Sequence, residues 1–181
     1  MNRALYLAPL GLLLLLLAGF SLGLDRDPKD LPSALIGQPL PAFELSALEP
    51  GGKPLASASL AADGEPKLIN IFASWCTSCR VEHGKLVQLA GEGVPIYGID
   101  WKDEPAAGRR YLAERSNPFR AVGSDPNGRA GVDLGVTGTP ETFLIDGKGI
   151  VRMRHTGPID DQVWQEKLAP MLAQLRAEAE A

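Results

Sequence analysis

Residues 67–83 read KLINIFASWCTSCRVEH, and this stretch indicates a strand followed by a helix. Residues 67–73 form a short apolar run, which is typical of a buried strand. Residues 81–90 then carry apolar side chains at helical intervals, and the two glycines that follow end the helix they predict. Cys76 and Cys79 therefore stand at the junction where a strand ends and a helix begins.

The position of the two cysteines at a helix start favours redox chemistry. Free N–H groups and the positive end of the helix dipole stabilise a thiolate there. Such an environment lowers a thiol pKa from about 8.5 to roughly 3.5–7.5. The thiolate is the species that attacks a disulfide. We expect Cys76, nearer the helix start and the surface, to be the nucleophile. Cys79, one turn inside, is then the resolving thiol that releases the partner.

Three other uses of the cysteines compete with this one. A structural disulfide between Cys76 and Cys79 closes a very short loop and would stabilise the fold weakly. A zinc site would also need His83 and His155, which are far more widely separated than the histidines of a zinc finger. Covalent haem attachment requires a histidine directly after the second cysteine, where Arg80 stands. We therefore favour a redox-active disulfide and expect no metal and no cofactor beyond it.

Composition sets the limits of this interpretation. The chain has 181 residues, 45% of them hydrophobic, and a formal net charge of −4. This length and composition suit one ordinary domain with some residues to spare. This mildly negative net charge differs from the strongly positive charge typical of nucleic-acid-binding domains, so we expect no nucleic-acid partner. Two cysteines are too few for a disulfide-stapled miniprotein or an all-cysteine metal site.

The amino-terminal segment predicts export. Residues 4–24 carry no charge, and a run of leucines lies at their centre. Roughly 20 apolar residues span a bilayer as a helix. Since Arg3 precedes the run and a net acidic flank follows it, the positive-inside rule places the remainder outside the cytoplasm. We expect residues 1–24 to be a membrane anchor; the alternative is a signal peptide cleaved near Ser21-Leu22-Gly23.

The remaining chain predicts an α/β domain. Residues 25–40 are rich in proline and are expected to form an extended tether before a domain over residues 41–178. The patterns predict strands over 94–99, 141–146 and 150–154. They predict helices over 104–116 and from Asp160 or Asp161 to Leu175. Pro170 is expected to kink or split the second of these helices. This order indicates a mixed central sheet with helices on its faces. Asp100-Trp101-Lys102 ends the second strand, and such strand ends line ligand crevices.

Two motifs together carry a family resemblance. The first is WCTSCRVEH at residues 75–83, and the second is GVTGTPETFLID at residues 135–146. The strand followed by Trp-Cys-x-x-Cys resembles the thioredoxin superfamily. The two longer motifs resemble, more particularly, the DsbE/CcmG thiol:disulfide interchange proteins of bacterial cytochrome c maturation. The resemblance runs from about Ile36 to Leu175 and includes the amino-terminal anchor.

The resemblance implies a thioredoxin-like fold and a peptide-binding site. Pro140 matches the family's cis-proline, which faces the cysteine pair. A cis bond there leaves the backbone of Thr139 free to pair with an extended peptide; the alternative is an ordinary trans turn proline. Trp75 is expected to cover the disulfide and to help the partner dock. The alternative is an aromatic side chain at the edge of the core.

Two glutamates are candidates for proton transfer. Glu82 follows Cys79 by three positions and shares its helical face. Glu141 adjoins Pro140 and is expected near the sulfur atoms in the implied fold. We hypothesise that Glu82 or Glu141 accepts the proton of Cys79. The alternative for both is an exposed, solvated glutamate.

The resemblance implies a single-pass protein of the bacterial inner membrane whose domain faces the periplasm. Its implied activity is reduction of the cysteine pair of apocytochrome c, or of a thiol protein that handles it in cytochrome maturation. A DsbD-type membrane reductant would restore the dithiol. Two alternatives stay open: a general thioredoxin-like reductase of exported proteins, and a non-catalytic module that binds apocytochrome or haem.

Overall fold

The structure is a computed structural model that describes residues 9, 11–17, 19–20 and 33–180. It divides the chain into two units, Met1–Leu31 and Pro32–Ala181. The described residues of the first unit are helical. Among the residues that the structure describes, no helix is both long and apolar enough to cross a membrane. Most of the predicted anchor, and the predicted tether up to residue 32, lie outside the described residues.

The second part of the predicted tether belongs to the folded unit. The Gly37 N–H donates to the Val151 carbonyl at 2.8 Å, and the Leu40 N–H donates to the Gly149 carbonyl at 2.8 Å. Leu40 is also buried. The prolines that predict an extended chain are compatible with these two hydrogen bonds, because an extended segment at a sheet edge pairs through the N–H groups of its non-proline residues.

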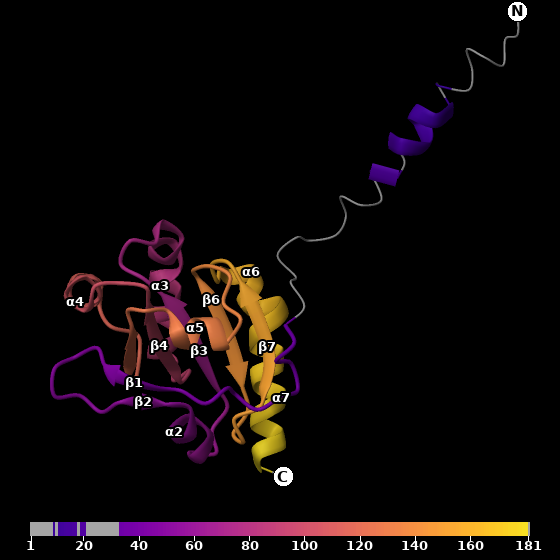
Figure 1. Cartoon of the computed structure of the whole chain (residues 1–181). Helices are drawn as coiled ribbons and strands as arrows, with labels where there is room; N and C mark the ends of the chain where they lie inside the picture. The colour runs from indigo at the N-terminus through magenta and orange to yellow at the C-terminus, as the bar shows by residue number, and fades with distance from the viewer. Residues whose placement is uncertain (1–8, 10, 18, 21–32, 181) are drawn as a thin grey trace, which may run out of the picture. The chain divides into compact units, whose positions relative to one another are not determined.

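The centre of the second unit is a seven-stranded mixed sheet (Figure 1). Its strand order is β2-β1-β5-β4-β3-β6-β7. The neighbours β3, β4 and β5 run parallel, and the other neighbouring pairs run antiparallel. The strands are β1 (Glu44–Ala47), β2 (Leu55–Ala56), β3 (Lys67–Phe72), β4 (Ile96–Trp101), β5 (Val122–Asp125), β6 (Glu141–Ile145) and β7 (Val151–Thr156).

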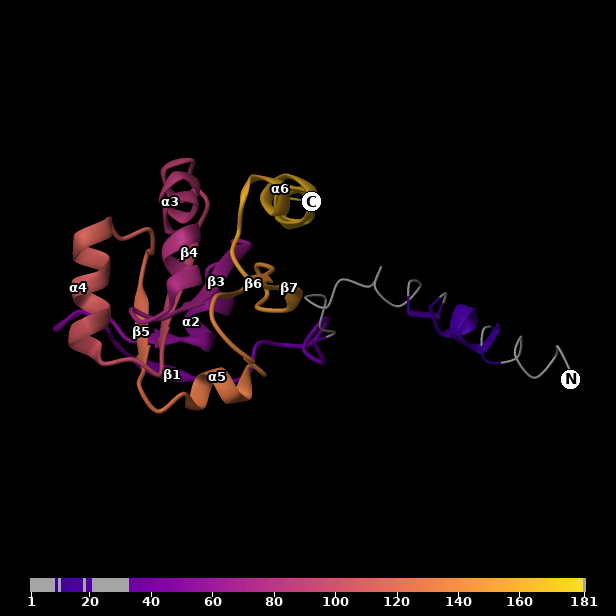
Figure 2. The same ribbon diagram turned by 90° about the horizontal axis from the view of Figure 1, so that it is seen from above.

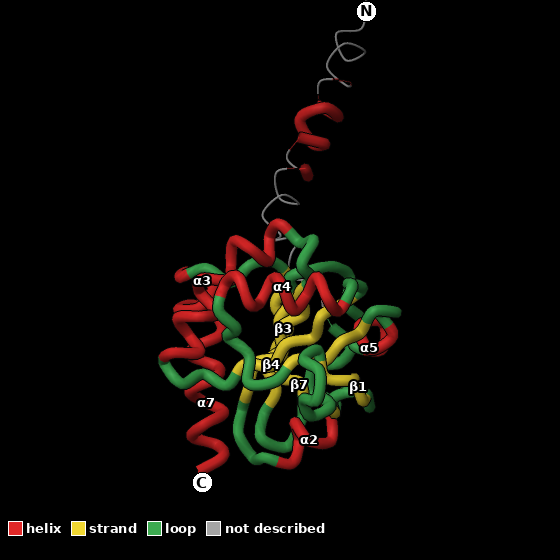
Figure 3. Tube along the Cα trace, turned by 90° about the vertical axis from the view of Figure 1, so that its left-hand side faces the viewer, coloured by secondary structure: helices red, strands yellow, loops and turns green. Residues whose placement is uncertain are grey.

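Helices cover both faces of this sheet, as predicted (Figure 2, Figure 3). One face carries α3 (Thr77–Gly91), α4 (Pro105–Arg115) and the carboxyl-terminal series α6 (Asp161–Val163), η1 (Trp164–Leu168) and α7 (Ala169–Glu180). The other face carries α2 (Ser57–Ala62) and α5 (Arg129–Asp133). Each face has its own hydrophobic cluster, so the unit has three layers.

Strand β3 lies at the centre of these layers. All six of its residues are buried. Because side chains alternate along a strand, Leu68 and Phe72 enter the cluster below α3, whereas Ile69 and Ile71 enter the cluster on the opposite face. Asn70 therefore points to the same face as α3. Burial on both faces explains why the strand is an almost continuous apolar run.

The structure refines the expected elements. Strands β1, β2 and β5 and helix α2 were not predicted, since they have two to six residues each and little periodicity. The expected kink or split at Pro170 takes another form: helical residues run without a gap from Asp161 to Glu180, but the π-helix η1 interrupts the α-helical geometry and ends at Leu168, just before Pro170. Proline has no N–H to donate to the turn before it, and a π-helical turn is one of the irregularities at which such a helix accommodates this.

Candidate active site

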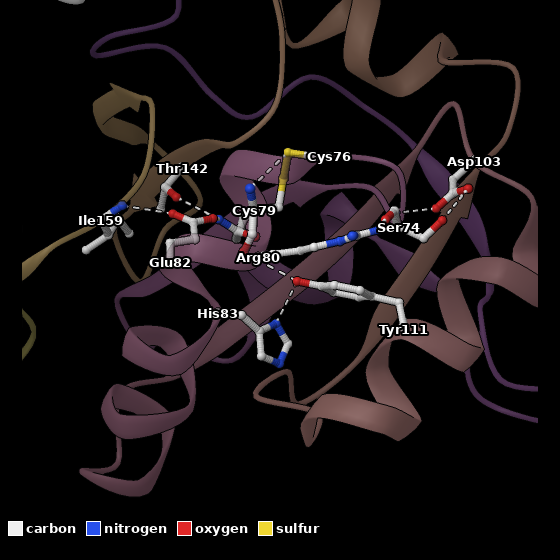
Figure 4. Close-up of a disulfide and its surroundings, with 11 residues drawn as sticks. Ser74, Cys76, Cys79, Arg80, Glu82, His83, Asp103, Tyr111, Thr142 and Ile159 are labelled. Carbon is white, nitrogen blue, oxygen red and sulfur yellow. Dashed lines mark hydrogen bonds between the residues drawn. A yellow bond between two sulfur atoms is a disulfide. The ribbon is translucent and has the colours of Figure 1, made fainter.

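Cys76 and Cys79 form a disulfide at the amino terminus of α3 (Figure 4). Their Cα atoms are 5.3 Å apart. Cys76 is the N-cap residue of the helix, and its Sγ accepts a hydrogen bond from the Cys79 N–H at 3.0 Å. The helix start predicted from the sequence is thus confirmed, with the first cysteine at the cap.

The N-cap hydrogen bond distinguishes the two sulfur atoms. Exposure does not, because Cys76 is 4% exposed and Cys79 is 2% exposed. In the reduced state the Cys79 N–H and the helix dipole are placed to stabilise negative charge on the Cys76 sulfur. This geometry supports Cys76 as the attacking thiolate and leaves Cys79 as the resolving thiol.

Glu82 is buried on α3 one turn beyond Cys79. It is 1% exposed, which is unlike the solvated glutamate of the alternative interpretation. One carboxyl oxygen accepts from Asn70 Nδ2 and the other from the Ile159 N–H, both at 2.9 Å. Burial raises the pKa of Glu82 to about 7, while the hydrogen bonds from Ile159 and Asn70 oppose the rise. A carboxyl group with this pKa exchanges protons readily near neutral pH.

Glu141 is buried as well, but its carboxylate is fully engaged. One oxygen accepts from the Thr137 N–H at 2.9 Å, the Thr137 hydroxyl at 2.7 Å and the Gly138 N–H at 3.1 Å. The other oxygen pairs with Arg154, with a closest distance of 2.8 Å. Donors thus surround the carboxylate on both sides. These contacts fit a residue that fixes the loop before Pro140.

Replacing Arg154 by methionine should destabilise the protein strongly. Its side chain is 6% exposed and that of Glu141 is 0% exposed, so the change leaves a buried carboxylate without its cation. We expect the free energy of unfolding to fall by about 3–5 kcal/mol, measured by urea denaturation. The matched control is Arg129→Met, since the Arg129–Asp133 pair is exposed and should contribute under about 1 kcal/mol. Equal losses in both variants would contradict this role for Arg154.

Thr139 and Pro140 lie beside the end of β3. The peptide bond between them is cis. Strand β6 pairs with β3 so that Glu141 stands opposite Ile71, which places Pro140 level with the residues leading to Cys76. In the part of the chain that the structure describes, the Thr139 backbone forms no internal hydrogen bond, and its Oγ1 is buried without a partner. This is compatible with the expectation that the backbone of Thr139 pairs with an extended peptide.

Trp75 presents an exposed aromatic surface directly before Cys76. The side chain is 53% exposed, and its indole Nε1 donates to the Lys102 carbonyl at 3.0 Å. This bond fixes the ring orientation, since Trp has a single donor. The exposure favours a docking role over that of an aromatic residue at the core edge.

Tyr111 and His83 support α3 and were not recognised as a pair from the sequence. The Tyr111 hydroxyl lies 3.3 Å from the Cys79 carbonyl and 3.0 Å from His83 Nδ1. His83 Nε2 lies 2.8 Å from the Ser116 carbonyl, so this nitrogen carries a proton. Both ring nitrogens thus already contact protein atoms. His83 lies on α3 and Tyr111 on α4, 28 positions apart in the sequence. No local sequence motif predicts that they are in contact.

Within the described residues, no cluster of three or more histidine, cysteine or acidic side chains is arranged to hold a metal ion. The groups that the structure does bring together are a helix-capping disulfide, a buried glutamate and a cis-proline loop. This arrangement can carry out thiol–disulfide exchange, in which one thiol attacks and the second releases the partner.

Comparisons with known proteins agree with this chemistry. Residues 35–171 match the Redoxin family. The thiol:disulfide interchange protein DsbE of Pseudomonas aeruginosa is 48% identical over 181 residues, covering 100% of this chain and 99% of that protein. The Escherichia coli protein of the same name is 40% identical over 184 residues, covering 99% of both chains.

Solved structures establish the fold. A Chlorobium tepidum protein assigned as a DsbE-type thiol:disulfide interchange protein superposes with a TM-score of 0.64 at 24% identity, covering 84% of this chain and 100% of that one. The implied thioredoxin-like fold is confirmed. The chain belongs to the redoxin family and, within it, to the DsbE thiol:disulfide interchange proteins, which are protein-disulfide oxidoreductases.

Proposed function

We propose that this oxidoreductase acts as a membrane-anchored periplasmic reductant. Its substrate is the oxidised cysteine pair of apocytochrome c, or of a thiol protein that handles apocytochrome during maturation. The observation that carries the proposal is the Cys76–Cys79 disulfide at the N-cap of α3, which lies within the first of the two family motifs. The two sulfur atoms carry both electrons, so the reaction as proposed uses no metal and no other cofactor.

The first step forms a mixed disulfide. The Cys76 thiolate attacks one sulfur of the partner's disulfide, and the partner's other sulfur leaves as a thiolate. The Cys79 N–H at 3.0 Å supports this step because it stabilises the attacking charge. Trp75 and the Thr139 backbone form the docking surface beside the reacting sulfur.

The second step releases the partner. Cys79 transfers its proton to Glu82 and attacks the Cys76 sulfur, which displaces the second partner thiolate and forms the Cys76–Cys79 disulfide. The buried Glu82 carboxyl, with its pKa raised to about 7 by burial, suits this transfer. Glu141 positions the loop before Pro140, so the proton-acceptor role is assigned to Glu82 alone.

The proposed location rests on the amino-terminal sequence. Residues 1–24 form the anchor and residues 25 to about 32 the tether, with the folded unit on the far side of the membrane. That compartment is oxidising. Each turnover leaves the protein oxidised, so a DsbD-type membrane reductant must return two electrons to the pair.

Restoration of cytochrome c maturation tests the proposed substrate. The full chain is expressed in a bacterium that lacks its own DsbE protein, and membrane-bound c-type cytochromes are measured by haem staining. We expect the wild-type chain to restore them and Cys76→Ser to restore none. Reduction of other exported disulfide proteins without any gain of c-type cytochromes would contradict the proposal and favour a general reductase.

A further inference from the structure

Asp100 is a buried carboxyl group that the proposed mechanism does not use. It is 0% exposed near the end of β4, and within the described chain neither of its oxygen atoms accepts a hydrogen bond from an N–H or hydroxyl donor. Ser124 is its register partner in β5, on the same face of the sheet, and the Ser124 Oγ also lacks a partner there. An ionised carboxylate without donors is costly to bury, so this site favours a protonated side chain.

The packing of α4 encloses this carboxyl group. A Cβ atom added to Gly108 would lie 2.2 Å from Asp100 Oδ2. Glycine therefore leaves the space in which the carboxyl group sits, and the helix above it excludes water. Any larger residue at this position would displace Asp100. Asp100 is thus enclosed between β4 and α4.

Asp103 is the charged side chain that interacts with Asp100. Its negative charge, and a hydrogen bond between the two side chains, both raise the pKa of Asp100. Two neighbouring carboxyl groups are more stable when they share a proton than when both are ionised. The charged side chains on the adjacent elements either contact other groups or are exposed; they are Arg80, Lys102, Glu104, Arg109 and Asp125. Among the described residues, none of them forms an ion pair with the carboxyl group of Asp100 or Asp103.

Asp103 in turn holds the segment that leads to the nucleophile (Figure 4). It accepts hydrogen bonds from the Ser74 N–H and from the Ser74 hydroxyl, the latter at 3.0 Å. Arg80 Nη2 donates to the Ser74 carbonyl at 2.9 Å on the other side. Ser74 lies two residues before Cys76. The orientation of Asp103 therefore influences the backbone position of Cys76 and the position of its sulfur at the N-cap of α3.

We propose that Asp100 is a positioning residue that, as a neutral carboxylic acid, donates a hydrogen bond to Asp103 and so holds the Ser74–Cys76 segment in its capping geometry. Desolvation first, and the charge of Asp103 second, raise the pKa of Asp100 to about 8, so the group is protonated at neutral pH. Above this pH Asp100 is charged and repels Asp103, which weakens the hydrogen bonds between Asp103 and Ser74.

An NMR titration of the full chain in detergent tests this role. The protein carries a 13C label in its aspartate carboxyl groups and 15N in its amides, and spectra are recorded from pH 5 to 10. We expect the Asp100 carboxyl to titrate near pH 8 and the Ser74 amide proton to shift with the same midpoint. In Asp100→Asn the Ser74 titration should disappear, whereas it should persist in the exposed control Asp133→Asn.

A rate measurement completes the test. The reduced protein is mixed with a small aromatic disulfide, and formation of the Cys76 mixed disulfide is followed. Asp100→Asn keeps a neutral donor and should retain most of the rate at pH 7, while Asp100→Leu should lose about tenfold or more. An Asp100 carboxyl that titrates near pH 4, or a Ser74 shift that persists in Asp100→Asn, would overturn the proposal. Neither result depends on the identity of the physiological partner.

Discussion

Cys79→Ala is expected to stop the reaction cycle after its first half. The variant keeps the backbone N–H that donates to the Cys76 sulfur at 3.0 Å, so the attacking thiolate remains stabilised. It lacks the thiol that displaces the partner. We therefore expect mixed disulfides through Cys76 to accumulate and turnover to fall on the order of a thousandfold or more, measured with a disulfide-bearing peptide by mass spectrometry.

The complementary variant is Cys76→Ala. Cys79 lies inside the helix and does not cap it, so it should form few mixed disulfides of its own. A passive binding module would behave differently, since it would bind its partner equally well with either cysteine replaced. Equal trapping by both variants would contradict the assignment of Cys76 as nucleophile.

Glu82→Gln is expected to slow the second half of the cycle selectively. The carboxylate accepts the Cys79 proton in our mechanism, and loss of such a base costs about a hundredfold or more. Because Glu82 must be ionised to accept a proton, the release step in the wild-type protein should rise through about pH 7. This rise should be absent in the variant. Rapid-quench kinetics of partner release from the mixed disulfide measure both effects.

Stability provides an independent check on Glu82. Its raised pKa means that the folded state holds a proton that the unfolded chain has released, so the free energy of unfolding falls as pH rises from about 4.5 to about 7. The fall should be smaller in Glu82→Gln and unchanged in the exposed control Glu166→Gln. Equal release rates in Glu82→Gln and wild type would show that another group takes the proton.

The position of the two cysteines at a strand–helix junction could be predicted, because it depends on residues that are close together in the sequence. The apolar run before Cys76 and the apolar spacing after Cys79 specify a strand and a helix, so their junction was visible in the sequence. The partners of Glu82 were not visible, because Ile159 lies 77 positions along the chain from it. Sequence spacing placed Glu82 on the correct helical face but could not show that it is buried.

Long-range contacts also explain the difference between the two glutamates. Glu141 stands next to Pro140 in the sequence, which made it a plausible proton acceptor. Its pairing with Arg154 depends on the β6–β7 register, where Phe143 faces Arg154. The link from Asp103 to Ser74 similarly depends on β3 and β4 ending side by side. Such contacts follow from topology and not from local pattern.

Electrons are expected to flow from the reduced protein to its substrate, and a single reaction measures this direction. The reduced full chain is mixed with an apocytochrome peptide whose haem-binding cysteine pair is oxidised, and free thiols are then alkylated and counted by mass spectrometry. We predict equal amounts of reduced peptide and of the Cys76–Cys79 disulfide. An intact peptide disulfide beside a still reduced protein, or net oxidation of the reduced peptide by the oxidised protein, would contradict the account.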